Sequence, residues 1–292
     1  MAPLLDEKMM RALTRLRLGT HDRVPGRNPG DSKNLDRGSS IEFTDYREYE
    51  PGDDYRSIDW NIYSRLDRLF VKVFSDEHNK GLRLIIDTSE SMAMGDPSKM
   101  RYATQIAAAL AYVALWNGDE VRLGSVTNHM NWHTPWWSGR HRLPQFLRSL
   151  NRLDPQGPTS LKQALERVDG DSRYFGDVTV LISDLFDSKC EQALASLSRL
   201  RTKSVLIHLL SPDDWLLNDT GEFDLIDQET GDVMTVYLDD HAVQAFAEKA
   251  TAWLEEVRSA CLAAGISCYQ LDTSHPFQDL LFTQFRKGGL LR

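Results

Sequence analysis

The feature that most constrains this chain is an apolar segment that ends in a turn rich in hydroxyl and carboxyl groups. Residues 82–86 read Leu-Arg-Leu-Ile-Ile, a short and mostly apolar run typical of a buried strand in a parallel sheet. Residues 87–91 read Asp-Thr-Ser-Glu-Ser and place one carboxylate and two hydroxyls in one loop. Because open α/β sheets bind ligands at the carboxyl ends of their strands, this loop is a candidate ligand site.

Two further loops add oxygen ligands of the same kind. Thr159 follows Gly157-Pro158 just before a helical pattern, and the apolar run 178–184 ends on Asp184. Hydroxyl and carboxylate oxygens suit a hard divalent cation such as Mg²⁺, which accepts one or two carboxylates and keeps some of its waters. A reading in which these residues serve only as helix caps and turns remains open. The candidate metal ligands are Asp87, Ser89, Ser91, Thr159 and Asp184.

The order of the apolar patterns predicts the fold class. Strand-like runs alternate with helical patterns several times over short connections, which predicts an α/β fold with a doubly wound, mostly parallel sheet. We expect an N-terminal extension over residues 1–80 and the α/β domain over residues 81–292. Helices are predicted at 3–18, 99–116, 141–151, 160–168, 189–201, 239–264 and 276–287, and strands at 82–86, 121–126, 129–134, 178–184, 204–210 and 266–271.

The five candidate ligands together resemble a metal-ion-dependent adhesion site. From about Gly81 onward the chain resembles the von Willebrand factor A family, a Rossmann-like fold. The resemblance implies that Ser89, Ser91 and Thr159 bind Mg²⁺, or Mn²⁺ or Ca²⁺, directly. It also implies that Asp87 and Asp184 lie close by or act through water, and that an acidic side chain of a partner fills a vacant coordination position.

A second distinctive stretch is the segment between Glu42 and Trp60. Arginines and aspartates alternate along it among aromatic residues, around the turn signal Pro51-Gly52. An internal network of ion pairs is one interpretation of the pattern, and a surface that recognises a partner is another. A catalytic carboxylate pair has no nearby His or Lys base to support it. The candidate partner-binding residues are Arg47, Asp53, Asp54, Arg56, Asp59 and Trp60.

The motif from Arg47 to Trp60 resembles the signature of the bacterial family called domain of unknown function 58. In that family it is followed by an arginine, here Arg65, and by a Val-Lys strand, here 71–73. The likeness continues at 212–215 and 223–231, and so covers the chain from about residue 38 nearly to its end. It implies a partnership with a MoxR-type AAA+ ATPase and a client protein. Many members begin with two membrane-spanning helices, which this chain lacks.

Charge and composition limit the class of protein further. The net charge of −9 disfavours nucleic-acid binding, which requires a basic surface. Residues 219–240 hold eight Asp and Glu and no Lys or Arg, and we expect an acidic hairpin insertion there. The longest apolar run, 106–116, is too short to span a bilayer, and residues 6–8 are charged where a signal peptide would be apolar. We therefore expect a cytoplasmic protein.

Three functions remain in competition. The first is a non-enzymatic, Mg²⁺-dependent adaptor that works with the ATPase in protein or complex maturation. The second is a Mg²⁺-dependent phosphohydrolase with Asp87 as nucleophile and Asp184 as a metal ligand. The third is a structural module that never binds a metal. The sequence has no glycine-rich phosphate loop and no nucleotide-binding fingerprint, and Ser89 stands where the hydrolase would need a general acid, so the adaptor is favoured.

Overall fold

The computed structural model describes residues 3–19, 41–50, 58–76, 80–168, 177–215, 220–226 and 233–292. They belong to two compact units, one of residues 1–20 with 80–292 and one of residues 21–79. The larger unit resumes at Lys80. The first helix, α1 (Glu7–Leu13), belongs to the larger unit rather than to the extension, because Leu13 is fully buried in the core of that unit. This helix is shorter than predicted, and the side chain of Asp6 caps its start by accepting a hydrogen bond from Met9 N at 2.6 Å.

The larger unit is built on a seven-stranded sheet with the order β11-β8-β7-β3-β4-β5, in which β6 also pairs with β4. Five strands run parallel and two short ones run antiparallel to β4. This confirms the predicted α/β fold with a mostly parallel sheet. The strands are β3 (Gly81–Asp87), β4 (Glu120–Val126), β5 (Met130–Trp132), β6 (Trp137–Ser138), β7 (Val178–Ser183), β8 (Lys203–Leu210) and β11 (Ser267–Asp272).

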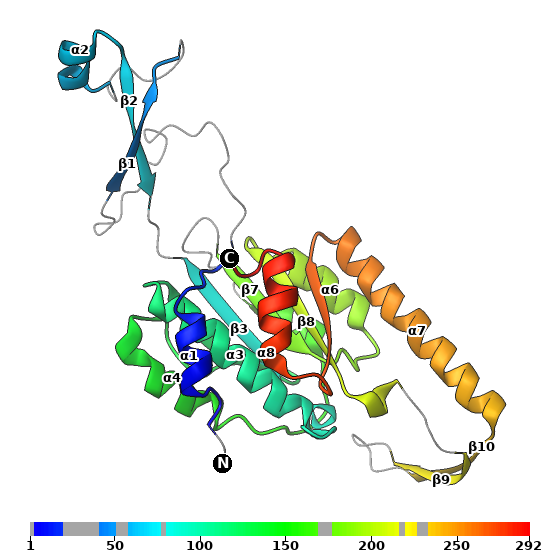
Figure 1. The fold of residues 1–292 in the computed structure, drawn as a ribbon. Coiled ribbons are helices and arrows are strands. Elements are labelled where there is room, and N and C mark those ends of the chain that lie inside the picture. Colours follow the sequence, from blue (N-terminus) through cyan, green and yellow to red (C-terminus); the bar gives the residue numbers. More distant parts are fainter. Residues whose placement is uncertain are drawn as a thin grey trace. The chain divides into compact units, whose positions relative to one another are not determined.

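Helices cover both faces of this sheet (Figure 1). The alternation of side chains along β3 divides the core in two, since Leu84 belongs to the cluster that includes side chains of α1, α3, α4 and α8, while Ile85 belongs to the cluster that includes side chains of α5, α6 and α7. The helices are α3 (Lys99–Trp116), α4 (Leu143–Leu150), α5 (Leu161–Glu166), α6 (Cys190–Ser198), α7 (Asp240–Ala263) and α8 (Phe277–Leu280), the last continued by a π-helical turn, Leu281–Phe285. The described part of the chain also contains three short 3₁₀ turns, η2 (Glu90–Ala93), η3 (Arg140–Arg142) and η4 (Pro212–Asp214).

The strand order places a topological switch between β3 and β7. From β3 the chain crosses to β4 on one side, and from β7 it crosses to β8 on the other side. Loops that leave in opposite directions open a crevice at the carboxyl ends of the two strands, where such folds bind ligands. Asp87 ends β3, and Asp184 follows the last residue of β7.

Two antiparallel hairpins complete the described structure. β9 (Gly221–Ile226) and β10 (Val233–Leu238) form the hairpin expected in the acidic stretch, and Tyr237 on it is 76% exposed. In the smaller unit, β1 (Ile41–Glu48) pairs with β2 (Phe70–Asp76), with α2 (Trp60–Leu66) between them in sequence. No helix in the described ranges is long and apolar enough to cross a membrane.

Candidate metal centre

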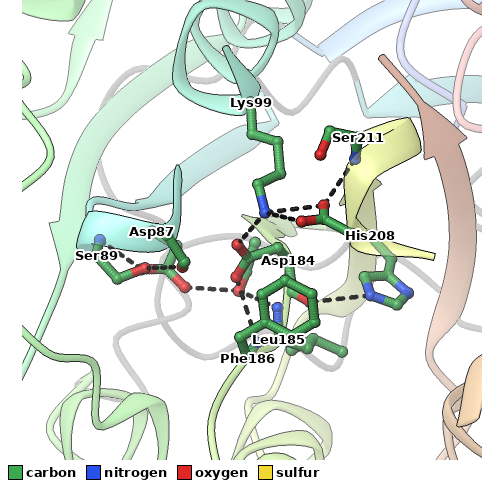
Figure 2. A network of polar contacts seen from close by, with 11 residues as sticks. Asp87, Ser89, Lys99, Asp184, Leu185, Phe186, His208 and Ser211 are labelled. Atoms are coloured by element: carbon green, nitrogen blue, oxygen red, sulfur yellow. Dashed lines mark hydrogen bonds and ion pairs between the residues drawn. The ribbon is translucent and has the colours of Figure 1, made fainter. Parts of the chain in front are cut away.

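The centre of the candidate site is a pair of carboxylates at the ends of the neighbouring strands β3 and β7 (Figure 2). The strands pair in parallel with Ile86 opposite Ile182, so that Asp87 and Ser183 come next to each other. The Ser183 hydroxyl donates to Asp87 Oδ2 at 2.6 Å. Asp87 and Asp184 are both fully buried, and a buried carboxylate requires compensation by hydrogen bonds or by positive charge.

The first loop brings two hydroxyls to the same place. The Ser89 amide donates to Asp87 Oδ1 at 2.9 Å, which folds the turn back onto the carboxylate. The hydroxyl oxygens of Ser89 and Ser91 lie 3.0 Å apart. Neighbouring ligands of an octahedral Mg²⁺ lie about 2.9 Å apart, given bonds of about 2.0–2.1 Å at right angles. The two hydroxyls therefore have the spacing of adjacent magnesium ligands.

The loop that carries Thr159 is fastened against this first loop. The backbone of Gly157 accepts from Glu90 N at 3.2 Å and donates to the Glu90 carboxylate at 3.3 Å, and Gln156 N donates to Thr88 O at 2.7 Å. The hydroxyl oxygen of Thr159 is buried and has no hydrogen-bond partner among the described residues. Because a buried hydroxyl normally finds a partner, this atom is a candidate ligand.

The pKa of Asp87 reflects its burial and the charge of its neighbour Asp184. The pKa of Asp87 is raised from 3.8 to about 7, mainly by burial and also by the negative charge of Asp184, while the hydrogen bonds from Ser183 and Ser89 act in the opposite direction. A divalent cation beside the two carboxylates would favour their ionised form.

A buried lysine that the sequence reasoning missed completes the network. Lys99, the first residue of α3, places its ammonium 2.8 Å from Asp184 Oδ2 and 2.9 and 3.0 Å from the two carboxylate oxygens of Asp214. Figure 2 shows this ammonium pointing toward the Asp184 carboxylate. A lysine in the first turn of a predicted helix carries no sequence signal of burial, so only the fold reveals it.

The residues after Asp184 are held in an unusual backbone conformation. Leu185 has φ 57°, in the left-handed region that side chains rarely adopt, and the Phe186 amide donates to Asp184 Oδ1 at 3.3 Å. Phe186 is consequently 40% exposed, with its ring stacked on Trp253 at 5.6 Å between centroids. Strain of this kind is often found at functional sites.

His208 contacts the backbone of the same loop. Its Nε2 lies 3.0 Å from the carbonyl oxygen of Asp184, and its Nδ1 has no partner in the described part of the chain. Burial lowers the pKa of His208 to about 4, so the ring is neutral at pH 7. A neutral ring that donates from Nε2 leaves Nδ1 without a proton, which fits the contacts observed.

These residues fit a hard divalent cation. The structure combines two hydroxyls at ligand spacing, a hydroxyl without a partner and two buried carboxylates. Within the described ranges, no three His, Cys, Asp or Glu side chains are placed to hold a metal, so the centre depends on its Ser and Thr oxygens. Such oxygens suit Mg²⁺ or Mn²⁺ better than a soft transition metal.

Of the candidate partner-binding residues, only two are described with their side chains. Asp59 is 6% exposed and caps α2, with Oδ1 accepting from Asn61 N at 2.8 Å and Oδ2 accepting from the hydroxyl of Tyr46 at 3.2 Å. Trp60 follows it and is 60% exposed. Asp59 thus has a structural role, whereas Trp60 is available to a partner. Asp53, Asp54, Arg56 and the side chain of Arg47 lie outside the described residues.

Comparison with known sequences gives matches that span most of the chain. The sequence pattern described as Protein of unknown function DUF58 matches residues 45–256. Uncharacterized protein Rv1480 of Mycobacterium tuberculosis is 27% identical over 294 residues, which cover 98% of this chain and 92% of that protein. Uncharacterized protein YeaD of Bacillus subtilis is 26% identical over 110 residues, covering 38% of this chain and 25% of that protein.

Comparison with solved structures finds distant similarity. BatB from Bacteroides thetaiotaomicron aligns with a TM-score of 0.44 at 15% identity, over 72% of this chain and 98% of that one. A von Willebrand factor type A protein from Catenulispora acidiphila aligns with a TM-score of 0.43 at 15% identity, over 75% of this chain and 43% of that one.

Proposed function

The chain belongs to the DUF58 family, and we propose that it is a non-enzymatic adaptor that docks a partner protein through a divalent cation. Ser89, Ser91 and Thr159 hold the cation, which is Mg²⁺ or alternatively Mn²⁺ or Ca²⁺. Asp87 and Asp184 supply the compensating negative charge. When bound, the cation offers a free coordination position to a carboxylate of the partner.

The observation that carries this proposal is the 3.0 Å separation of the Ser89 and Ser91 hydroxyl oxygens beside buried Asp87. The two hydroxyls lie within hydrogen-bonding distance of each other, and this spacing also suits two adjacent ligands of one cation. Mg²⁺ keeps several water ligands when only a few protein oxygens hold it, and a carboxylate can replace such a water. The arrangement therefore suits a bridge between two proteins.

The partner we propose is a MoxR-type AAA+ ATPase, which the family resemblance implies. The ATPase would supply energy, and this chain would hold a client protein during protein or complex maturation. The buried carboxylates favour a cation bridge because they can attract a cation without reaching a partner themselves.

The phosphohydrolase alternative is less compatible with the geometry. Its nucleophile would be Asp87, but both carboxylate oxygens of Asp87 accept hydrogen bonds, from Ser89 N and from Ser183 Oγ. The side chain is also fully buried. An attacking carboxylate must reach the substrate, and the burial of this one stands against that role.

The test measures cation binding and partner binding on the same proteins. Titration calorimetry with MgCl₂ compares the wild type with Ser91→Ala and with Ser138→Ala, which removes an exposed hydroxyl on β6. Capture of the purified MoxR-type ATPase of the same organism is then measured with Mg²⁺ and with EDTA. We expect the wild type and Ser138→Ala to bind the cation and the ATPase, and Ser91→Ala to lose at least about tenfold in cation affinity.

Three results would contradict the proposal. A wild-type protein without measurable affinity for Mg²⁺, Mn²⁺ or Ca²⁺ would exclude the metal bridge. ATPase capture that is equal in Mg²⁺ and EDTA would move docking to another surface. Hydrolysis of p-nitrophenyl phosphate that depends on Asp87 would favour the enzyme instead.

A further inference from the structure

Lys99 connects the candidate metal centre to a second segment of the chain. Its side chain is fully buried, and so is that of Asp184, while that of Asp214 is 7% exposed. Asp184 follows β7 at the metal centre, whereas Asp214 ends the short turn η4. The ammonium therefore bridges two segments through three contacts of 2.8–3.0 Å.

The η4 turn depends on the carboxylate that Lys99 contacts. Asp214 Oδ2 accepts a hydrogen bond from Ser211 N at 2.7 Å and so closes the turn. Ser211 also packs closely on the loop between η2 and α3, since a Cβ atom placed on Gly95 would lie 2.9 Å from Ser211 Cβ. Along the chain, this turn leads into the acidic hairpin β9–β10.

The surroundings of the ammonium make its contacts strong. The Phe186 ring covers it, with Nζ 4.7 Å from the ring centroid. An aromatic face attracts a cation and excludes water, so salt and solvent screen the charges near Lys99 only weakly. A second cation close to Asp184 would act on Lys99 directly.

We propose that Lys99 is a positioning residue that links cation binding at the metal centre to the Ser211–Asp214 turn. This inference rests on the proposed function. A divalent cation held by Ser89 and Ser91 attracts the Asp184 carboxylate and repels the ammonium. The ion pair with Asp184 then weakens, and the ammonium is held more closely by Asp214, which already accepts its two hydrogen bonds. Cation binding thereby stabilises the turn that precedes the acidic hairpin.

Amide hydrogen exchange at the turn tests the link. The Ser211 amide donates to Asp214, so its exchange rate reports on the contact that should change. We expect MgCl₂ to slow exchange in peptides covering 211–215 by roughly fivefold in the wild type. Asp213→Asn, which alters the neighbouring carboxylate in the same turn, should keep this response. Lys99→Met and Asp214→Asn should lose it while still binding Mg²⁺ in calorimetry.

The outcomes separate this inference from the proposed function. If MgCl₂ slows amide exchange equally in the wild type and in Asp214→Asn, the proposed role of Lys99 is overturned. The Asp214→Asn variant gives this test even if Lys99→Met does not fold. Binding of Mg²⁺ by the wild type without any change at Ser211 overturns the link alone. Failure of the wild type to bind Mg²⁺ overturns both.

Discussion

The ammonium of Lys99 lies 2.8 Å from Asp184 Oδ2, and neither side chain is exposed to solvent. A buried ion pair of this kind adds little net stability, because both partners lose their hydration. Its loss is nevertheless costly, since the remaining charge stays buried without compensation. Lys99 therefore serves as the buried counter-ion of Asp184.

This relationship predicts how charge removal affects stability. In EDTA, Lys99→Met should lower the free energy of unfolding by roughly 3–5 kcal/mol, because Asp184 loses its counter-ion. The double variant Lys99→Met/Asp184→Asn should recover part of that loss. Urea denaturation measures both. Lys162→Met, which removes a 4.0 Å surface pair with Glu166, should change stability by less than about 1 kcal/mol.

The stability lost in the double variant could equal the sum of the losses in Lys99→Met alone and in Asp184→Asn alone. That result would show that Lys99 and Asp184 contribute independently to stability. In that case the ammonium would be fixed by Asp214 alone.

The pKa shifts of Asp87 and His208 predict opposing effects of pH on stability. The pKa of Asp87 is raised to about 7, so from pH 4 to 7 the folded state holds a proton that the unfolded state has released, and stability falls as pH rises. The pKa of His208 is lowered to about 4, so between pH 4 and 6.5 the unfolded state holds the extra proton, and stability rises with pH. The two contributions largely cancel in the wild type.

Asp87→Asn should remove the contribution of Asp87 to the pH dependence of stability. Relative to the wild type, the variant should gain about 1.4 kcal/mol of stability per pH unit between pH 4.5 and 6, because only the His208 contribution remains. Urea denaturation in EDTA at pH 4.5, 5.2 and 6.0 measures the difference. Parallel stability curves for the two proteins would show that Asp87 does not hold a proton in this range.

The sheet was predictable from the sequence because its strands are buried on both faces. In β7, Leu181 and Ile182 face opposite layers of helices and must both be apolar, which produces the continuous apolar runs that mark a parallel strand. Asp87 and Asp184 were identifiable for a related reason. A carboxylate directly after such a run lies at the ligand-binding edge of the sheet.

The contacts that complete the site could not be predicted in the same way. Lys99 and Asp214 are 115 residues apart, and no local pattern relates them. Leu185 also gave no signal, since its φ of 57° is a conformation that leucine disfavours and that its sequence does not predict. Local sequence patterns thus predicted where the strands end, but not which distant side chains make contact there.

Phe186 provides a test of where a partner docks. It is 40% exposed beside Asp184, and stacking on Trp253 holds it in place, as in aromatic anchors of protein interfaces. Phe186→Ala should weaken ATPase capture by at least about tenfold and leave Mg²⁺ affinity within about twofold of the wild type. Leu262→Ala, which shortens an 81% exposed side chain at the end of α7, is the matched control. If both variants capture the ATPase equally, the partner does not contact the rim of the metal centre.

Replacing Thr159 should change stability and cation binding in opposite directions. Its buried hydroxyl has no partner among the described residues, and an unpaired buried hydroxyl costs about 1–3 kcal/mol. Thr159→Val keeps the shape and removes this oxygen, so in EDTA the variant should unfold at the same or a higher temperature than the wild type. The upward shift of the unfolding temperature on adding MgCl₂ should become much smaller, because one cation ligand is lost. A variant that is destabilised in EDTA but keeps the full Mg²⁺ shift would show that the hydroxyl serves the fold rather than the cation.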